Sequence, residues 1–191
     1  MHGLNLTLFY RGPLRATRNP DTEDGRRRQH KHDIRSQFDP QLRRRFGHWQ
    51  GNPAIVRHEG FMLPFYAYST KENLFLVKLD ILMLRPQPPG HVISGGDIDN
   101  RIKTLFDALC APKINQLPDS TSEGLKRIEQ AGPIRCLMQD DNLITDVSIS
   151  TDTLLDVDPT SEDVVLIIGA ELHTRNPVTW VTGGPTGDIA V

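Results

Sequence analysis

Acidic side chains gather in two short segments of the sequence. Asp97 and Asp99 stand two residues apart directly after a Gly-Gly pair, and Asp140-Asp141 forms a second group further along the chain. In an extended approach to a helix, side chains two residues apart point the same way. Converging carboxylates repel one another, and a divalent cation relieves this repulsion. Hard oxygen ligands favour Mg²⁺, and Mn²⁺ can substitute for it. The spacing therefore predicts a metal site.

A lysine stands where it can assist chemistry at such a site. Lys103 follows Asp99 by four residues, so on a helix both side chains share one face. Two metal ions can clamp the attacking and leaving oxygens of a phosphodiester, and an ammonium group can neutralise charge that develops on the phosphate. The pattern thus indicates metal-dependent cleavage of phosphodiester bonds.

Simpler interpretations of the same residues remain open. Asp97 can be a plain helix cap, Asp99 and Lys103 an ordinary surface pair, and Asp140-Asp141 a solvated turn. A calcium-binding EF-hand does not fit, because Arg101 and Ile102 stand where that loop needs an oxygen ligand and a glycine.

The elements that must position these residues follow from hydrophobic periodicity. Between Asp99 and Ala111, Ile102, Leu105, Phe106 and Leu109 repeat at helical spacing, which predicts a helix with one apolar stripe. On that helix Asp107 lies one turn beyond Lys103, and we expect it to orient the lysine. Alternating or continuous apolar runs predict strands at 4–10, 54–59, 61–68, 73–84, 143–150 and 162–172.

Two further helices complete the predicted set. Residues 122–130 form a short amphipathic segment, and Asp39-Pro40 resembles an N-cap followed by proline at the first helical position. We expect an α+β domain over residues 1–172, with a mixed or antiparallel sheet of about five strands and the Asp-bearing helix packed on one face. Residues 11–29 should form a mobile loop, and the tail 173–191 should be flexible and unpaired.

Composition limits the class of protein. The 191 residues suit one domain, and 37% hydrophobic with 24% charged residues excludes a disordered chain and a membrane protein. Cys110 and Cys136 fit no metal or redox motif, and no secretory signal begins the sequence. A reduced, cytoplasmic protein is the simplest interpretation.

Charge is distributed unevenly along the chain. Residues 11–49 contain 11 Lys and Arg against 5 Asp and Glu, so this segment carries +6 while the rest carries −8. Arginine suits phosphate because its planar fork matches the anion. We therefore expect the segment to contact DNA, while a solvated arm without a partner is the alternative. The candidate DNA-binding residues are Arg26, Arg27, Arg28, Arg43, Arg44, Arg45 and Arg101.

Taken together, the acidic segments resemble the signature of the RusA family of Holliday junction resolvases. The signature is an Asp-x-Asp-Asn-x-x-Lys-x-x-x-Asp-Ala-Leu helix followed by an Asp-Asp pair that leads into a strand, and it occurs here as residues 97–109 and 140–144. The resemblance implies a dimeric, Mg²⁺-dependent endonuclease that cuts branched DNA such as four-way junctions in recombination and repair. It also implies that Asp97, Asp99 and Asp141 bind the metal, that Asp140 supports them, and that Lys103 is catalytic.

The chain departs from the family in two respects. It is longer than a compact family member, mainly through the Arg-rich stretch and the tail. A short glycine-containing turn usually joins the helix to the Asp-Asp pair, whereas here residues 110–139 intervene and are interpreted as an insertion. Two alternatives to the nuclease remain: a nucleic-acid-binding protein of the same fold with weak or no cleavage, and a metal-dependent transferase for nucleotide sugars. The transferase lacks support, because no glycine-rich phosphate turn is present.

Overall fold

The computed structural model describes residues 4–15, 25–47, 52–58, 60–72, 75–87, 98–155, 157–158, 160–174, 180–182 and 188–190. Asp97 lies outside these ranges, as do residues 16–24 of the predicted mobile loop at 11–29. Residues 11–13 belong to a strand and residues 25–29 to a helix, so the prediction of a loop is wrong at both ends. None of the helices in the described ranges is both long and apolar enough to span a membrane.

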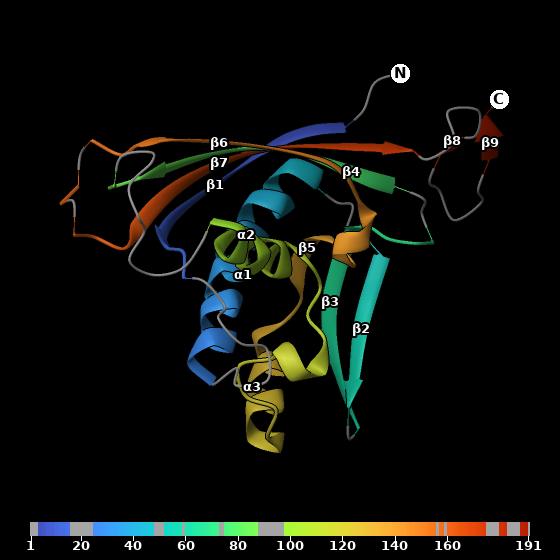
Figure 1. Cartoon of the computed structure of the whole chain (residues 1–191). Coiled ribbons are helices and arrows are strands. Elements are labelled where there is room, and N and C mark those ends of the chain that lie inside the picture. Colours follow the sequence, from blue (N-terminus) through green and yellow to red (C-terminus); the bar gives the residue numbers. More distant parts are fainter. Residues whose placement is uncertain are drawn as a thin grey trace.

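A mixed four-stranded sheet forms the largest layer (Figure 1). Its order is β1 (Leu4–Pro13), β7 (Asp163–Thr174), β4 (Phe75–Arg85) and β6 (Ile144–Thr153). β7 runs antiparallel to both of its neighbours, whereas β6 pairs parallel to β4. The predicted α+β class and mixed sheet are confirmed, with four strands in this sheet.

The remaining strands of the body form a second sheet of three strands. β2 (Asn52–His58) pairs antiparallel with β3 (Phe61–Ser69), and β3 pairs parallel with β5 (Ile134–Met138). Two of its strands were predicted, but β5 was not. Residues 110–139, interpreted as an insertion, thus contribute the strand β5 to this sheet. β5 escaped prediction because it is only five residues long and its apolar residues do not alternate with polar ones: Arg135 is followed by three apolar residues.

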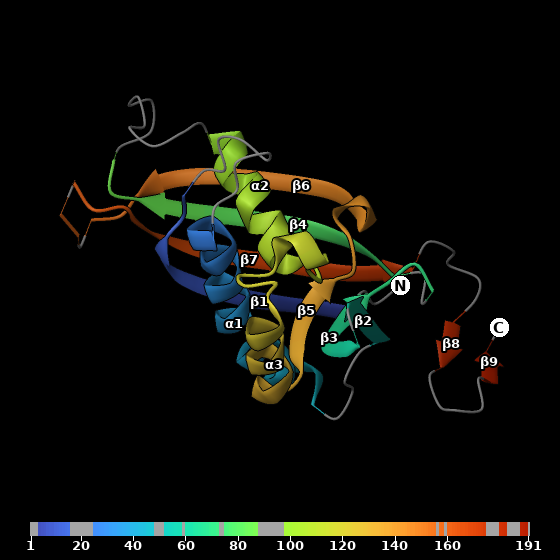
Figure 2. The same ribbon diagram turned by 90° about the horizontal axis from the view of Figure 1, so that it is seen from below.

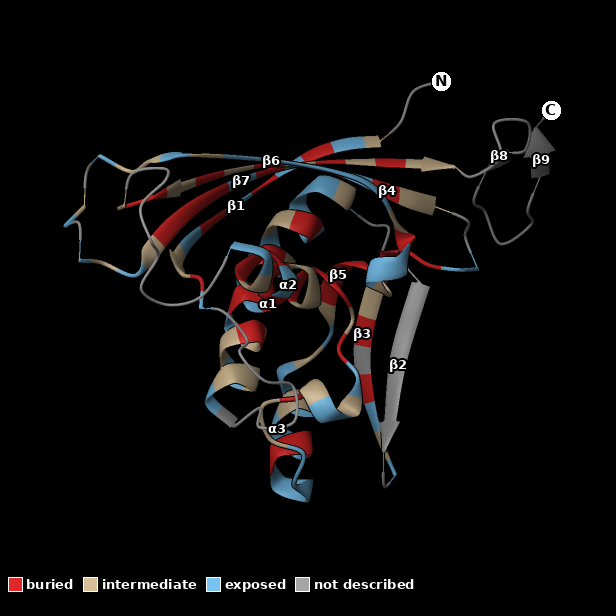
Figure 3. Cartoon of the chain, viewed as in Figure 1, coloured by how far each residue is buried: buried red, intermediate tan, exposed pale blue. Residues whose placement is uncertain are grey.

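Three α-helices lie on one side of the large sheet (Figures 1 and 2). They are α1 (Gly25–Phe46), α2 (Ile98–Leu109) and α3 (Ser122–Ala131); the short 3-10 helices η2 (Ile114–Gln116) and η3 (Asp141–Leu143) follow α2 and precede β6. Buried side chains of α1, α2 and the large sheet form one core, and α3 packs against the small sheet around Phe65 and Leu125 (Figure 3).

Helix α1 is longer than predicted, and Asp39-Pro40 lies inside it. Ile34, Phe38 and Leu42 repeat every four residues and are almost fully buried, so tertiary packing overrides the proline. Asp39 does not cap a helix. Its carboxylate instead accepts a hydrogen bond from the backbone nitrogen of Arg135, at 2.8 Å, and thereby ties α1 to β5.

The C-terminal tail also differs from expectation. β8 (Trp180–Thr182) pairs antiparallel with β9 (Asp188–Ala190), so the prediction that the tail pairs with nothing is wrong. Both strands contain β-branched residues, Val181 and Ile189, which sit opposite each other and favour pairing.

Pro40→Ala is expected to stabilise the protein. A proline inside a helix removes one backbone hydrogen bond and crowds the preceding turn, at a cost of ~3 kcal/mol, while it restricts the unfolded chain by less than ~1 kcal/mol. Alanine should therefore raise the free energy of unfolding by about 1–2 kcal/mol, measured by urea denaturation. Pro133→Ala, in the loop before β5, is the control. A loss of stability in Pro40→Ala would contradict the expectation.

Candidate active site

One cavity brings three of the predicted site residues together. It has a volume of about 690 Å³ and lies between α2 and β6. Asp99 and Lys103 reach it from α2, and Asp141 reaches it from η3. The rest of its lining consists of Ile98, Ile102, Phe106, Ile149 and Thr151. Residues separated by some forty positions in sequence thus share one space.

The amphipathic character of α2 explains the orientation of its charged side chains. Ile102 and Leu105 are buried in the main core, which fixes the rotation of the helix about its axis. Asp99 and Lys103, four residues apart, are exposed together on the side that faces β6. The helix therefore presents a carboxylate and an ammonium group to the same cavity.

Asp140 and Asp141 have different roles in the turn before β6. Asp140 is the N-cap of η3, and its carboxylate accepts a hydrogen bond from the backbone nitrogen of Asn142 at 3.2 Å. Asp141 is exposed and lines the cavity. Asp140 thus fixes the turn that presents Asp141.

The donor atoms at this cavity suit a hard divalent cation. Asp99 and Asp141 supply carboxylate oxygens, and Thr151 adds a hydroxyl. Within the described ranges no three His, Cys, Asp or Glu side chains converge closely enough to hold a metal ion. Mg²⁺ does not need such a cage, since it usually keeps several waters and takes one or two carboxylates plus substrate phosphates. The residues present fit this kind of binding.

Asp107 does not orient Lys103, and that expectation is wrong. Its carboxylate instead pairs with Lys31 of α1, with 2.8 Å between Nζ and Oδ2. The Lys31 side chain is only 4% exposed, so this ion pair joins two packed helices. The reason for the difference is that α1 packs beside α2 and brings a cation to Asp107 from another element.

A second cation of α1 binds the C-terminal end of α2. Arg35 is fully buried, and its Nε and Nη2 donate hydrogen bonds to the carbonyl oxygens of Cys110 and Asp107, at 3.0 and 2.7 Å. Carbonyl oxygens at the end of a helix have no N–H donor within the helix, and a cation there also complements the helix dipole. Burial lowers the pKa of Arg35, yet a guanidinium remains charged in proteins.

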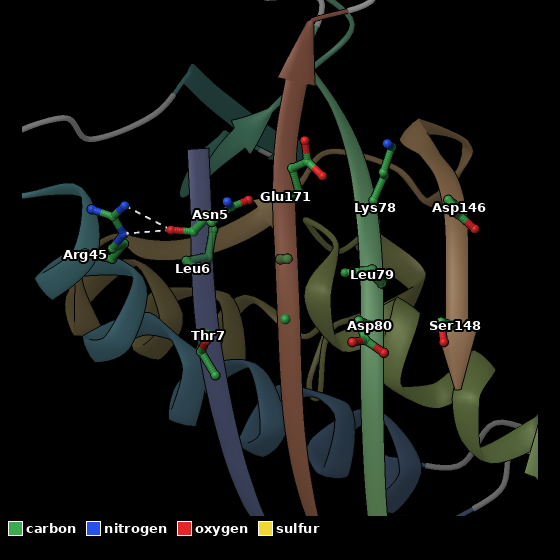
Figure 4. A pocket seen from close by; sticks show the side chains of 12 residues that line it. Asn5, Leu6, Thr7, Arg45, Lys78, Leu79, Asp80, Asp146, Ser148 and Glu171 are labelled. Carbon is green, nitrogen blue, oxygen red and sulfur yellow. Dashed lines mark hydrogen bonds between the residues drawn. The ribbon is translucent and has the colours of Figure 1, made fainter. Parts of the chain in front are cut away.

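The candidate DNA-binding arginines lie in unlike surroundings. Arg26 and Arg44 are exposed near opposite ends of α1, while Arg27 and Arg28 are half-buried. Arg43 pairs with Asp39 at 2.8 Å, and Arg45 donates two hydrogen bonds to the Asn5 carbonyl oxygen (Figure 4). Of the whole set, Arg26 and Arg44 are the most available to an external phosphate.

Arg101 is the buried member of the set. It is 7% exposed in the first turns of α2, and burial, followed by the nearby Arg85 guanidinium, lowers its pKa. α2 is exposed on the side that carries Asp99. Arg101 follows Asp99 by two residues and therefore lies on the opposite, buried side of the helix.

Sequence reasoning missed the apolar lining of the cavity and the two cations that hold α2. Ile149 was recognised only as a strand residue, although it is 40% exposed beside α2. The sequence did contain a signal for the two cations. Lys31 and Arg35 fall on the same helical stripe as the apolar Ile34 and Phe38, and charged residues on a buried stripe need partners. Both cysteines are buried, and burial raises their thiol pKa values, to about 12 for Cys136.

Asp107→Asn is expected to destabilise the protein by ~3 kcal/mol, because it leaves the buried Lys31 ammonium without its opposite charge. Urea denaturation measures the loss. Adding Lys31→Met to Asp107→Asn should recover more than half of it, since the uncompensated charge is then removed. Equal stability of wild type and Asp107→Asn would show that this pair does not hold α1 against α2.

Comparison with known proteins adds no relative to this picture. The sequence matches no protein-family model. A search of curated proteins also finds no match. These comparisons therefore show no family for the chain, and its function is inferred from the cavity and from the motifs that form it.

Proposed function

We propose that the chain is a Mg²⁺-dependent endonuclease that cuts branched DNA, as the resemblance to the RusA family implies. The observation that carries the proposal is the shared cavity of Asp99, Lys103 and Asp141. The two carboxylates come from different elements and line one cavity together with a lysine, and these are the groups that phosphodiester cleavage needs. If Asp99 and Lys103 were only a solvated surface pair, nothing would require Asp141 to line the same cavity.

Each residue has a defined task in this proposal. Asp99 and Asp141 hold the divalent cation, and the cation when bound supplies an electrophile that polarises the phosphodiester. Asp97, outside the described residues, is the third ligand that the resemblance implies. Lys103 places its ammonium group beside the scissile phosphate and stabilises the additional negative charge of the transition state.

The surroundings of the cavity favour a nucleic acid strand over a small molecule. Ile98 and Ile149 are exposed apolar residues at the lining, 37% and 40% accessible, and give contact area to sugars or bases. The exposed Arg26 and Arg44 are available for backbone phosphates. Branched DNA as the preferred substrate and a homodimer as the active unit are taken from the resemblance.

Asp99→Asn and Asp141→Asn are each expected to reduce Mg²⁺-dependent cleavage of a labelled four-way junction by at least ~100-fold, because each removes a charged metal ligand. DNA affinity, measured by gel shift in Ca²⁺, should be unchanged or higher, since one carboxylate that repels phosphate is gone. Lys103→Ala should cost ~2–4 kcal/mol in the activation barrier with little change in binding.

The control for these variants is Asp33→Asn, which changes an exposed carboxylate of α1 away from the cavity. It should cut at the wild-type rate. Near-normal cleavage by both Asp99→Asn and Asp141→Asn would contradict the assignment of the metal ligands. Binding of branched DNA by wild type without any Mg²⁺- or Mn²⁺-dependent cleavage would favour the alternative, a binding protein of the same fold.

Replacing Arg26 and Arg44 together by Ala should weaken the salt dependence of DNA binding. Each phosphate contact contributes ~0.9 to the slope of log affinity against log salt concentration, so losing two contacts should flatten the slope by ~1.8. The measurement is DNA affinity over a salt series for wild type and the double variant. Arg127→Ala, an exposed arginine of α3, is the control. An unaltered slope in the double variant would remove α1 from the DNA-binding surface.

A further inference from the structure

Strand β6 lies at one edge of the large sheet, and within the described ranges it pairs with β4 alone (Figure 2). In a parallel pair, alternate residues direct their N–H and C=O groups to the neighbouring strand, so about half of these groups on β6 point away from the sheet. Proteins usually block such an edge with lysine, proline or a covering segment. The ten residues of β6 include no lysine, arginine or proline, and residues 146–153 keep a continuous register with β4. The edge is therefore able to pair with another strand.

The other edge of the same sheet is blocked by helix α1. Gln41 accepts a hydrogen bond from the Phe9 backbone nitrogen at 2.8 Å and donates one to the Phe9 carbonyl oxygen at 2.7 Å. Arg45 donates two hydrogen bonds to the Asn5 carbonyl oxygen (Figure 4). In the small sheet, Asp39 of α1 accepts a hydrogen bond from a backbone nitrogen of the edge strand β5. Side chains of α1 thus occupy backbone groups of β1 and β5, whereas β6 lies away from this helix (Figure 2).

Apolar side chains are exposed on the helix-facing side of the β6 edge. Val147 and Ile149 of β6 are 37% and 40% exposed, and Ile98 at the start of α2 is 37% exposed. Ile98 and Ile149 line the same cavity, and Val147 lies on the same side of the sheet as Ile149. A strand beside β6 turns every second side chain toward α2 and can cover this apolar cluster. The cluster therefore favours a partner strand that is apolar at alternate positions.

The side of the β6 edge that faces away from the helices is acidic. Asp146, Ser148 and Asp152 occupy alternate positions of β6 on this side. The neighbouring strand β4 places Lys78 opposite Asp146 and Asp80 opposite Ser148 (Figure 4). Three carboxylates thus accompany one ammonium group. Because cross-strand pairs of opposite charge stabilise a sheet, lysine or arginine opposite Asp146 and Asp152 is complementary to this side.

A second copy of this chain and a nucleic acid both suit the edge less well. When two β6 strands pair antiparallel about Ile149, Asp146 of one lies opposite Asp152 of the other, and like charges directly opposite destabilise a sheet. The same carboxylates repel phosphate groups, and β6 itself has no cation to offset them. The charge pattern therefore favours a basic polypeptide.

We propose that the free edge of β6 binds an extended segment of another protein, which adds to the large sheet as a further strand and alternates basic with β-branched apolar residues. Backbone hydrogen bonds to β6 supply affinity, and the alternate side chains supply specificity. The apolar residues of the segment cover Val147 and Ile149, and its basic residues pair with Asp146 and Asp152. Binding here involves neither the metal ligands nor cleavage, so it is tested independently of the proposed function.

The probe is a fluorescein-labelled peptide, Lys-Val-Thr-Ile-Thr-Val-Lys, which reads the same in both directions and so suits a parallel or an antiparallel partner. Its two lysines have the same separation as Asp146 and Asp152. Fluorescence anisotropy should show saturable binding with a Kd below ~100 µM. The peptide Glu-Val-Thr-Ile-Thr-Val-Glu has the same apolar residues and should bind at least ~10-fold more weakly, because it places like charges opposite each other.

Charge reversal on β6 should exchange this preference. The double variant Asp146→Lys with Asp152→Lys is expected to bind the glutamate peptide at least ~10-fold more tightly than the lysine peptide. The control is Asp33→Lys with Glu123→Lys, which changes exposed carboxylates of α1 and α3 and alters the net charge equally. It should keep the preference of the wild type. Circular dichroism checks that both variants are folded, and the wild-type measurements test the proposal even where a variant is not.

Two N-methylated forms of the lysine peptide test for strand addition itself. Alternate N–H groups of a strand point to opposite edges, so methylation of the Val and Ile nitrogens blocks one edge of the peptide and methylation of the Thr nitrogens blocks the other. One form should lose binding and the other should keep it. Amide hydrogen exchange of the full chain locates the contact, because the lysine peptide should slow exchange in β6 and leave β1 unchanged.

Several results overturn the proposal. They are the absence of lysine-peptide binding up to ~1 mM, equal binding of the lysine and glutamate peptides, and binding that leaves exchange in β6 unchanged. Binding that both methylated forms keep, or that both lose, also contradicts strand addition at one edge. Protection of β6 that rises with protein concentration without peptide assigns the edge to a second copy, and protection by branched DNA in place of the peptide assigns it to nucleic acid.

Discussion

The contact on which the site depends is the pair of buried cations that α1 directs at the end of α2. Arg35 donates to two carbonyl oxygens at the C-terminus of α2, and Lys31 pairs with Asp107 one turn earlier. Both cations are nearly inaccessible to water, so their partners must stay in place or the charges are left unpaired. Asp99 and Lys103 belong to the same helix, so these contacts also fix the positions from which the two side chains reach the cavity.

The two sides of β6 have different surroundings. Ile149 and Thr151 face α2 and the cavity, whereas alternate residues, among them Asp152, lie on the opposite side of the sheet. The strand order leaves β6 at the edge of the large sheet, next to β4, and the cavity lies between this edge strand and α2. The position of β6 therefore determines which side chains of the sheet reach the candidate site.

Much of the fold was predictable where the pattern was local. The apolar stripe of α2, the alternation in β1 and the aliphatic run of β4 each identified their element, since tertiary packing there agrees with local preference. Asp39-Pro40 misled the prediction of α1, because a buried stripe on both sides of Pro40 outweighs the cost of one proline. β5 was missed for the opposite reason: its short run pairs with a strand far away in sequence.

The candidate site was predictable in its chemistry and not in its supports. Spacing alone related Asp99 to Lys103, and the motif added Asp141, which the structure brings to the same cavity. Nothing near Asp107 in sequence identifies Lys31 as its partner, because that contact requires the packing of two helices. The same holds for Ile149 and Thr151, whose place at the cavity follows from the position of β6 beside α2.

Mn²⁺ binding tests whether Asp99 and Asp141 hold one cation between α2 and β6. Electron paramagnetic resonance of free Mn²⁺ during a titration gives the affinity of wild type, Asp99→Asn and Asp141→Asn without any DNA substrate. Wild type is expected to bind Mn²⁺, and each variant is expected to bind it at least ~10-fold more weakly. Equal Mn²⁺ affinity in all three proteins would contradict the assignment of Asp99 and Asp141 as metal ligands.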